Sequence, residues 1–179
     1  MFKNTWRHGL VRVAFIGRFQ PLHLGHVKVL EWLSERYDDV VVVIGSADKG
    51  ITRDNPFTVG ERIEMFLRTF DKRFVLCAVP DTNGGSSLWG AYVRHWCPRF
   101  EVAFSNNGYV RAALRYAGVD VREHPLFDRE ILSGKHIREM IALGDQKWRE
   151  LVPRSVSDLI DEVDGVRRIR DLYEEVRFI

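Results

Sequence analysis

The sequence has few cysteines, no long hydrophobic run and little net charge. Its two cysteines, Cys77 and Cys97, match no metal-binding spacing, and we expect a buried free thiol at Cys77, which lies in an apolar run. The longest strongly apolar run, 40–44, is too short to cross a bilayer, and residues 1–10 lack the hydrophobic stretch of a signal peptide. The net charge of +2 is too small to indicate a nucleic-acid partner. These absences favour a soluble cytoplasmic protein that binds neither membranes nor nucleic acids.

The amino-acid composition of the sequence is that of a folded domain. Of the 179 residues, 45% are hydrophobic and 12% are aromatic, which excludes a disordered chain and is sufficient for a sizeable core. Neither an internal repeat nor a low-complexity linker divides the sequence. We therefore predict a single domain over residues 1–179.

Strand-like and helix-like segments alternate through most of the sequence. Short apolar runs predict strands at 11–16, 40–44, 74–79, 102–104 and 119–122. Helical patterns separate them at about 25–37, 59–70, 87–96 and 110–117. After Pro125 only helical patterns occur. We predict an α/β fold with a doubly wound, mostly parallel, Rossmann-like sheet over about 11–125 and a helical C-terminal part over 126–179.

The most informative segment is 17–26, which reads Gly-Arg-Phe-Gln-Pro-Leu-His-Leu-Gly-His. It joins the first predicted strand to the first predicted helix, and α/β proteins hold nucleotide phosphates at such a junction. His23 and His26 share one face if both enter the first helical turn, and Gly25 removes a side chain where a ligand would approach the backbone. The segment indicates chemistry on a nucleoside triphosphate. The alternative is that both histidines only cap or fill the start of the helix.

A second segment of this kind opens a later helix. Ser133 is a good N-cap residue, and Gly134 allows the backbone to approach a ligand. Lys135 and a protonated His136 place positive charge at a helix N-terminus, which the helix dipole disfavours by roughly a few tenths of a kcal/mol or more. A bound anion would relieve that conflict; otherwise these side chains simply point into water.

These motifs resemble those of the archaeal-type nicotinamide mononucleotide (NMN) adenylyltransferases, a family of the HxGH nucleotidyltransferase superfamily. The similarity extends over nearly the whole sequence. The superfamily is marked by His-Leu-Gly-His at 23–26 and by Ser-Gly-Lys-His-Ile-Arg at 133–138. The NMN branch is indicated by Gly-Ser-Ala at 45–47, by Asn-Pro-Phe-Thr-Val-Gly-Glu-Arg at 55–62 and by the region of Trp89.

The resemblance implies a nucleotidyltransferase fold and transfer of AMP from ATP to the 5′-phosphate of NMN, giving NAD and pyrophosphate, with Mg²⁺ as cofactor. The family commonly assembles as a homo-oligomer, often a hexamer. By motif position, the residues expected to be catalytic are Arg18, His23, His26 and Arg138. The further residues expected on the ATP side are Gly17, Phe19, Gln20, Gly25, Ser133, Gly134 and Lys135. Those expected on the NMN side are Asp81, Asn83, Asn106 and Trp89, whose ring would stack on the nicotinamide.

Such a reaction needs alignment and charge rather than a protein nucleophile. The second pKa of a mononucleotide phosphate is about 6, so the phosphate is ionised at neutral pH and needs no general base. In-line attack on the α-phosphorus then proceeds without a covalent intermediate. Histidine and arginine donors, a helix N-terminus and Mg²⁺ suffice to offset the charge that grows on the triphosphate. Mg²⁺ commonly stays on the phosphates with its waters, so no protein metal ligand is expected.

The sequence departs from the family pattern at a few positions. Lys135 stands where threonine is usual, His136 where an acidic residue is common, and Leu22 where phenylalanine is usual. The loop 81–89 is one residue longer than expected, which affects the alignment of the residues predicted to contact NMN there.

Two other functions stay open at this point. The first is the same chemistry with nicotinate mononucleotide, FMN or phosphopantetheine as the phosphate acceptor. A stacking Trp89 favours a pyridine ring over a pantetheine arm, although a tryptophan on an amphipathic helix is also often a core residue. The second is a module that senses ATP or NAD without catalysis. The presence of both histidines together with Arg18 and Arg138 argues against it.

Overall fold

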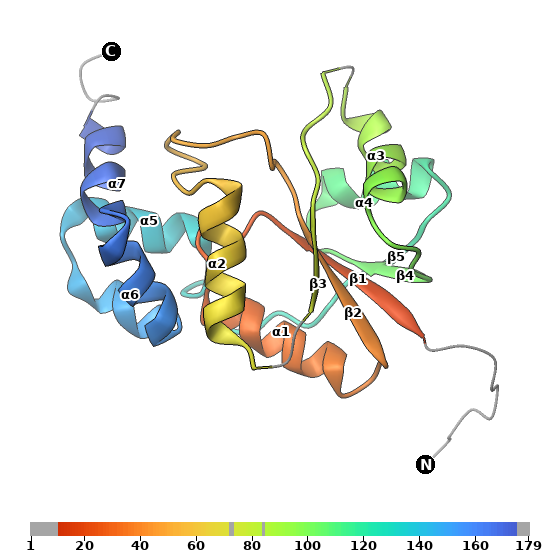
Figure 1. Cartoon of the computed structure of the whole chain (residues 1–179), viewed down its shortest axis with the longest axis horizontal. Helices are drawn as coiled ribbons and strands as arrows, with labels where there is room; N and C mark the ends of the chain where they lie inside the picture. The colour runs from red at the N-terminus through yellow and green to blue at the C-terminus, as the bar shows by residue number, and fades with distance from the viewer. Residues whose placement is uncertain (1–10, 72–73, 84, 175–179) are drawn as a thin grey trace.

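The computed structural model describes residues 11–71, 74–83 and 85–174, and its centre is a five-stranded parallel sheet (Figure 1). The strands are β1 (Arg12–Gly17), β2 (Asp39–Ile44), β3 (Val75–Ala78), β4 (Val102–Phe104) and β5 (Asp120–Arg122). Their order in the sheet is β3-β2-β1-β4-β5, so the chain moves outward from β1 to β3 and then crosses back to β4. The strand order therefore reverses between β1 and β4, and ligands bind outside the carboxyl ends of the strands at such a point.

The side chains of the sheet form two core clusters, one on each face, because they alternate along each strand. On one face Phe15 belongs to a cluster with Leu30 of α1 (Leu24–Ser34) and Phe66 of α2 (Val59–Thr69). On the other face Ile16 belongs to a cluster with residues of α3 (Trp89–Trp96) and α4 (Gly108–Tyr116). Because both faces are covered, the central strands β1 and β2 are almost uninterrupted runs of buried residues.

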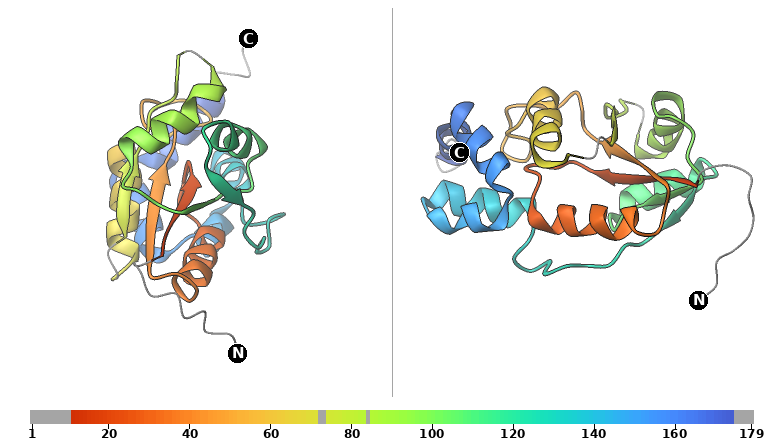
Figure 2. Two further views of the ribbon diagram at one scale, coloured as in Figure 1. Left: turned by 90° about the vertical axis from the view of Figure 1, so that its right-hand side faces the viewer. Right: turned by 60° about the horizontal axis from the view of Figure 1, so that its bottom comes forward.

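After β5 and an irregular segment over 123–133, the regular elements are all helical. They comprise α5 (Gly134–Leu143), the 3₁₀ segment η2 (Gln146–Leu151), α6 (Arg154–Glu162) and α7 (Gly165–Glu174). In Figures 1 and 2 these helices form one end of the molecule, away from α3 and α4. Trp148 and Ile160 are fully buried in the cluster that also contains Phe15 of the sheet. The C-terminal helices and the sheet therefore contribute to the same core cluster.

The α/β fold and its elements are confirmed, with shifts at some ends. The helix expected at 110–117 begins at Gly108, because the Asn107 side chain accepts hydrogen bonds from the backbone N–H groups of Tyr109 and Val110. The helix expected at 87–96 begins as a 3₁₀ turn, η1 (Ser86–Leu88), and becomes α-helical at Trp89.

The structure can be compared with three sequence-based expectations, which concern the cysteines, the lack of a long hydrophobic run and residues 1–10. Cys77 and Cys97 are buried and free, which confirms the state expected for Cys77. Among the described residues, none of the helices combines the length and apolarity that a membrane span requires. Residues 1–10, where no signal peptide is expected, lie outside the described residues.

Candidate active site

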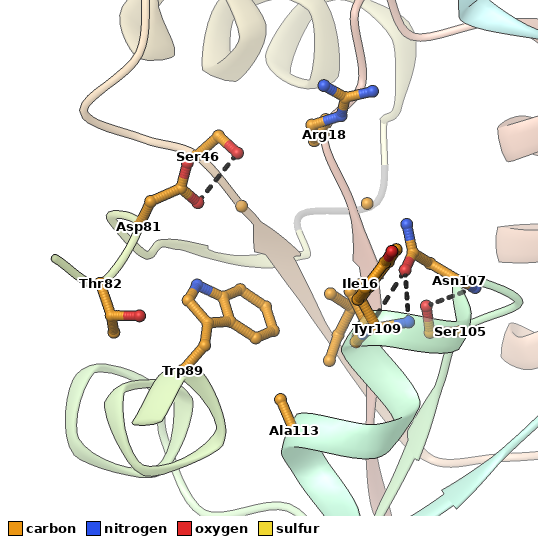
Figure 3. A pocket seen from close by; sticks show the side chains of 13 residues that line it. Ile16, Arg18, Ser46, Asp81, Thr82, Trp89, Ser105, Asn107, Tyr109 and Ala113 are labelled. Carbon is orange, nitrogen blue, oxygen red and sulfur yellow. Dashed lines mark hydrogen bonds between the residues drawn. The ribbon is translucent and has the colours of Figure 1, made fainter. Parts of the chain in front are cut away.

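Two cavities meet at the carboxyl ends of β1 and β4. One, of about 280 Å³, lies on the face covered by α1; we call it the histidine cavity, and it is lined in part by His23, His26, His124, Arg129, Ser133 and Gly134. The other, of about 490 Å³, lies on the face covered by α3 and α4; we call it the aromatic cavity, and it is lined in part by Arg18, Asp81, Trp89, Tyr109 and Ala113 (Figure 3). Ile16, Ser105 and Asn107 line both. Ligands in the two cavities would therefore adjoin at the end of β1.

The histidine pair is built into the first turn of α1. His23 is the N-cap residue, and its carbonyl accepts hydrogen bonds from the N–H groups of His26 and Val27 at 2.9 and 3.2 Å. In return the His23 N–H donates to Nδ1 of His26 at 3.3 Å. The two rings stack with their centroids 3.6 Å apart and their planes 25° from parallel. Both imidazoles thus lie together at a helix N-terminus, as the three-residue spacing predicted.

Burial keeps these imidazoles neutral at pH 7. It lowers the pKa of His23 to about 4, and His23 is only 6% exposed. Burial also lowers the pKa of His26, and the neighbouring His23 and His124 lower it further. Nδ1 of His23 is buried and has no hydrogen-bond partner among the described residues. A buried donor or acceptor without a partner is unusual, and a polyphosphate would provide negative charge and acceptors for such a cluster.

The glycines of both motifs have close protein neighbours. A Cβ on Gly25 would lie 3.0 Å from Nδ1 of His23 and 3.2 Å from Cβ of Leu132. A Cβ on Gly134 would lie 2.8 Å from the carbonyl oxygen of Gln20. These glycines therefore let the start of α5 pack closely against the start of α1. Two helix N-termini face one cavity as a result, which concentrates backbone N–H groups and positive dipole ends there.

Three residues predicted on the ATP side have structural partners. Gln20 is buried, and its amide donates to the Phe57 carbonyl at 2.8 Å and accepts from the Phe57 N–H at 2.9 Å. Phe19 is buried with its ring edge-on to that of His26, 4.7 Å between centroids, and a Cβ on Gly17 would lie 2.8 Å from the Phe19 ring. These residues hold the neighbouring loop and the His26 ring in place.

Two buried arginines fix the loops around the cavities. Arg138 donates to the Gln20 carbonyl at 2.8 Å and lies 3.3 Å from Oδ1 of Asp54, and its Nε has no partner among the described residues. Arg62 is fully buried and donates to the carbonyls of Arg18, Gly45 and Ser46 at 2.8–3.0 Å. Burial lowers the pKa of Arg62 to about 10, with the positive charge of Arg18 acting in the same direction, so it remains charged at pH 7. The loops that follow β1 and β2 are thus joined by one guanidinium.

Trp89 lines one side of the aromatic cavity. It begins α3, is 8% exposed, and its Nε1 donates to the Pro80 carbonyl at 3.1 Å. Asp81 lies near the indole in Figure 3 and accepts a hydrogen bond from the Ser46 hydroxyl at 3.0 Å. Among the described residues lining this cavity, Asp81 supplies the one carboxylate. Trp89 is therefore both a core residue and a cavity wall, so the two interpretations of it coexist.

The remaining predicted residues lie at different places. Ser133 caps α5, accepting from the His136 N–H at 3.3 Å, and lines the histidine cavity. Lys135 is exposed and lies 3.8 Å from Glu139 on the solvent side of α5. Asn83 is exposed and is not among the described residues lining either cavity. Asn106, which is expected to contact NMN, lines the histidine cavity, and its side-chain amide donates to the His124 carbonyl and accepts from the His124 N–H.

Sequence reasoning missed His124 and Arg129 in the histidine cavity, and Tyr109 and Asn107 in the aromatic cavity. His124 and Arg129 lie in the irregular segment after β5, where no periodic pattern marks them. The one usable signal was their position just beyond a strand, since parallel strands end at the same edge of the sheet.

The chain is similar to known proteins over most of its length. Residues 14–79 match the cytidylyltransferase-like family model. The sequence is 42% identical to a nicotinamide-nucleotide adenylyltransferase of Pyrococcus horikoshii over 91% of this chain and 89% of the relative. It is 44% identical to a protein of the same name from Halobacterium salinarum over 92% of this chain and 94% of the relative.

A solved structure from Francisella tularensis has the same fold. It is a bifunctional NMN adenylyltransferase/ADP ribose pyrophosphatase complexed with AMP and a manganese ion, with a TM-score of 0.70 and 18% sequence identity. The alignment covers 95% of this chain and 54% of that chain, so this chain spans about half of the bifunctional protein.

Proposed function

The chain belongs to the nicotinamide-nucleotide adenylyltransferase family and is a nucleotidyltransferase that uses ATP and NMN, and from this premise we propose how its cavities divide the two substrates. The histidine cavity takes the polyphosphate of ATP, and the aromatic cavity takes the nicotinamide nucleoside of NMN. The observation that carries this division is the meeting of two imidazoles and two helix N-termini in one cavity, next to a second cavity walled by Trp89.

The histidine cavity suits a polyphosphate because its polar groups are mainly donors or become donors. His23 and His26 lie at the N-terminus of α1, and Ser133 and Gly134 at that of α5. Arg129 adds a fixed positive charge to the lining. Each of these features favours negative charge, and charge-assisted hydrogen bonds are the strong ones.

The aromatic cavity suits a pyridine nucleoside. Its volume of about 490 Å³ falls within the range of small-molecule sites, and Trp89 offers an indole face for stacking. The Asp81 carboxylate accepts hydrogen bonds from a carboxamide NH₂ but repels a carboxylate. We therefore infer that the cavity prefers the nicotinamide ring of NMN to the nicotinate ring of its acid analogue.

The residues that line both cavities, which we call the shared wall, mark where the two substrates would react. The 5′-phosphate of NMN would reach Ile16, Ser105 and Asn107 from one side, and the α-phosphate of ATP would reach them from the other. The ionised 5′-phosphate attacks the α-phosphorus in line, and pyrophosphate leaves with its growing charge against the histidines and helix N-termini. The nucleophile belongs to the substrate, so the reaction needs neither a general base nor a covalent intermediate.

Mg²⁺ would enter with ATP rather than bind a protein cage. Among the described residues, no group of three or more His, Cys, Asp or Glu side chains is arranged to hold a metal ion. An ion carried by phosphates and water, as Mg²⁺ commonly is, needs no such group. When bound, the ion would neutralise part of the triphosphate charge.

We further propose a homo-oligomer, often a hexamer in this family, in the cytoplasm. Three large aromatic residues on α3 and α4 support self-association: Trp96, Tyr109 and Tyr116 are 54%, 81% and 78% exposed. Light scattering coupled to gel filtration would measure the subunit number, and a monomeric mass at micromolar concentration would contradict the oligomer.

The experiment that tests the reaction is pyrophosphate release from ATP and Mg²⁺ with one acceptor at a time. NMN, nicotinate mononucleotide, FMN and phosphopantetheine are offered separately, and the products are separated by chromatography. We expect release with NMN and the appearance of NAD. Release with another acceptor alone would keep the phosphate site and reject the assignment of the aromatic cavity. ATP binding without release for all four acceptors would indicate a sensing module.

A further inference from the structure

A third histidine lines the histidine cavity, and it comes from a different part of the chain. His124 follows β5 and is half-buried, with its ring edge-on to Phe15 at 5.3 Å between centroids. The His26 ring lies 6.2 Å from the same Phe15 ring. Three imidazoles thus surround one cavity, two from the start of α1 and one from the segment between β5 and α5.

The contacts of His124 Nδ1 favour one position for its ring proton. The Pro125 carbonyl oxygen lies 2.9 Å from Nδ1 and can only accept, whereas Nδ2 of Asn106 lies 3.3 Å from it and can only donate. The Asn106 amide already donates to the His124 carbonyl at 3.0 Å and accepts from the His124 N–H at 3.1 Å, and the shorter contact of Nδ1 is the one to Pro125, so we assign the ring proton to Nδ1. Neutral His124 therefore has a lone pair, not a proton, on Nε2.

His26 has the opposite tautomer. Its Nδ1 accepts the hydrogen bond from the His23 N–H, so the proton of the neutral ring lies on Nε2. Neutral His26 can already donate to a phosphate oxygen. Neutral His124 cannot, because the Nε2 lone pair and the oxygen lone pairs repel each other, and it becomes a donor only as an imidazolium.

We propose that His124 is a third phosphate-binding imidazole of the ATP site and that it takes up a proton when the polyphosphate binds. This rests on the proposed binding of the ATP polyphosphate in the histidine cavity. One proton from solvent adds to Nε2 and donates to a non-bridging phosphate oxygen, while Nδ1–H stays on the Pro125 carbonyl. No other bond changes. The bound anion and the Pro125 carbonyl together stabilise the added charge.

The charges around His124 make the free site start neutral. Burial lowers the pKa of His124; the Pro125 carbonyl acts in the opposite direction, and Arg129 lowers it further. His26 and His23 face the same cavity from α1 and its N-cap. The nearby carboxylates have other partners: Glu123 pairs with Arg111 of α4, and Asp128 pairs with Lys28 of α1. The counter-charge for a protonated His124 must therefore come from the ligand.

Isothermal titration calorimetry tests the proposal. The probe is Mg²⁺ with α,β-methylene ATP, which cannot transfer AMP, titrated at about pH 8 in buffers of different ionisation enthalpy, so that the heat reports protons taken up. We expect the wild type to take up close to one proton, and its affinity to rise up to about tenfold for each pH unit of acidification.

The matched variants are His124→Gln and His95→Gln, the latter an exposed histidine of α3 away from both cavities. His124→Gln should take up almost no proton, bind the probe up to about a hundredfold more weakly at neutral pH, and lose most of the pH dependence. His95→Gln should behave as the wild type does. Proton uptake in His124→Gln equal to that of the wild type would overturn the proposal.

A measurement on the unaltered protein covers the case in which His124→Gln does not fold. The ¹⁵N resonances of the imidazoles distinguish a protonated from an unprotonated Nε2, and histidine substitutions elsewhere assign them. With the probe bound at about pH 8, a protonated Nε2 of His124 supports the proposal, and an unprotonated one overturns it. Failure of the proposed function looks different: if the polyphosphate does not occupy the histidine cavity, the imidazole resonances of His23 and His26, which line it, would stay unchanged when the probe binds.

Discussion

Acidification should destabilise the folded protein through His23. Burial lowers the pKa of this imidazole from the ordinary 6.5 to about 4. The unfolded chain keeps the ordinary pKa, so below about pH 6.5 it binds a proton that the folded chain does not bind. The free energy of unfolding is therefore highest above pH 6.5 and falls as the pH drops toward 4. The lowered pKa of His26 acts in the same direction.

The size of the effect follows from the two pKa values. At about 1.4 kcal/mol per pKa unit, the difference between 6.5 and about 4 corresponds to about 3 kcal/mol when fully developed. Between about pH 7 and pH 5 the expected loss from His23 alone is about 2 kcal/mol. That is a large part of the roughly 5–15 kcal/mol by which most domains are stable.

Urea unfolding at about pH 7, 6 and 5 measures this dependence. The wild type is compared with His23→Asn, which removes the titrating group, and with His95→Asn, which removes an exposed histidine. The stability of His23→Asn should fall less steeply with acid, by about 2 kcal/mol over this range, and His95→Asn should follow the wild type. Inorganic tripolyphosphate should stabilise the wild type more at pH 5 than at pH 7. Equal slopes for the wild type and His23→Asn would refute the reasoning.

Three further predictions concern turnover. His26→Ala should lower kcat by about 10²–10³-fold with little change in the KM of NMN, because the Nε2–H of His26 would donate to the triphosphate as its negative charge grows. An unchanged kcat in steady-state assays would contradict the placement of His26 at the phosphates. Trp89→Ala should raise the KM of NMN about tenfold, because stacking of a base on an aromatic ring contributes about 1–3 kcal/mol. Tyr92→Ala, on the same helix, should leave this KM unchanged. An effect confined to the KM of ATP would remove Trp89 from the NMN site. Asp81→Asn should lower the kcat/KM for NMN relative to the kcat/KM for nicotinate mononucleotide. Ser46→Ala keeps the carboxylate and should largely retain this ratio. An unchanged ratio in Asp81→Asn would exclude Asp81 as the discriminating group.

The fold was predictable because its signals are local. Consecutive buried residues in β1 and β2 produce apolar runs that hardly admit another interpretation. Capping residues mark helix starts in the sequence: the Thr58 hydroxyl accepts from the Glu61 N–H at 3.3 Å, and the Glu61 carboxylate accepts from the Thr58 N–H at 2.9 Å. The start of α4 was misplaced because its Asn107 cap lacks an acidic partner three residues later.

The site was predictable only where its residues sit in motifs on helix starts. His23 and His26 follow from spacing, but a motif does not reveal which of its side chains face the ligand. Lys135 lies beside Glu139, one helical turn later, on the exposed side of α5. Gln20 has both polar atoms on Phe57, because a contact distant in sequence decides its orientation. His124 lies outside every motif for the same reason: only the parallel sheet brings the end of β5 beside α1.

Charge explains why each substrate would enter its own cavity although both carry phosphate. A triphosphate in the aromatic cavity would meet one arginine, Arg18, but also the Asp81 carboxylate and an indole face that offers it no donor, since the Trp89 N–H is held by the Pro80 carbonyl. In the histidine cavity it would meet two helix N-termini and three imidazoles, of which His124 is the one proposed to gain a proton as the anion arrives. An NMN molecule has one phosphate and an uncharged carboxamide, so only its phosphate is drawn toward the shared wall. Its ring can then remain on Trp89 with the carboxamide toward Asp81, and its phosphate faces the α-phosphorus of ATP without any moving catalytic base.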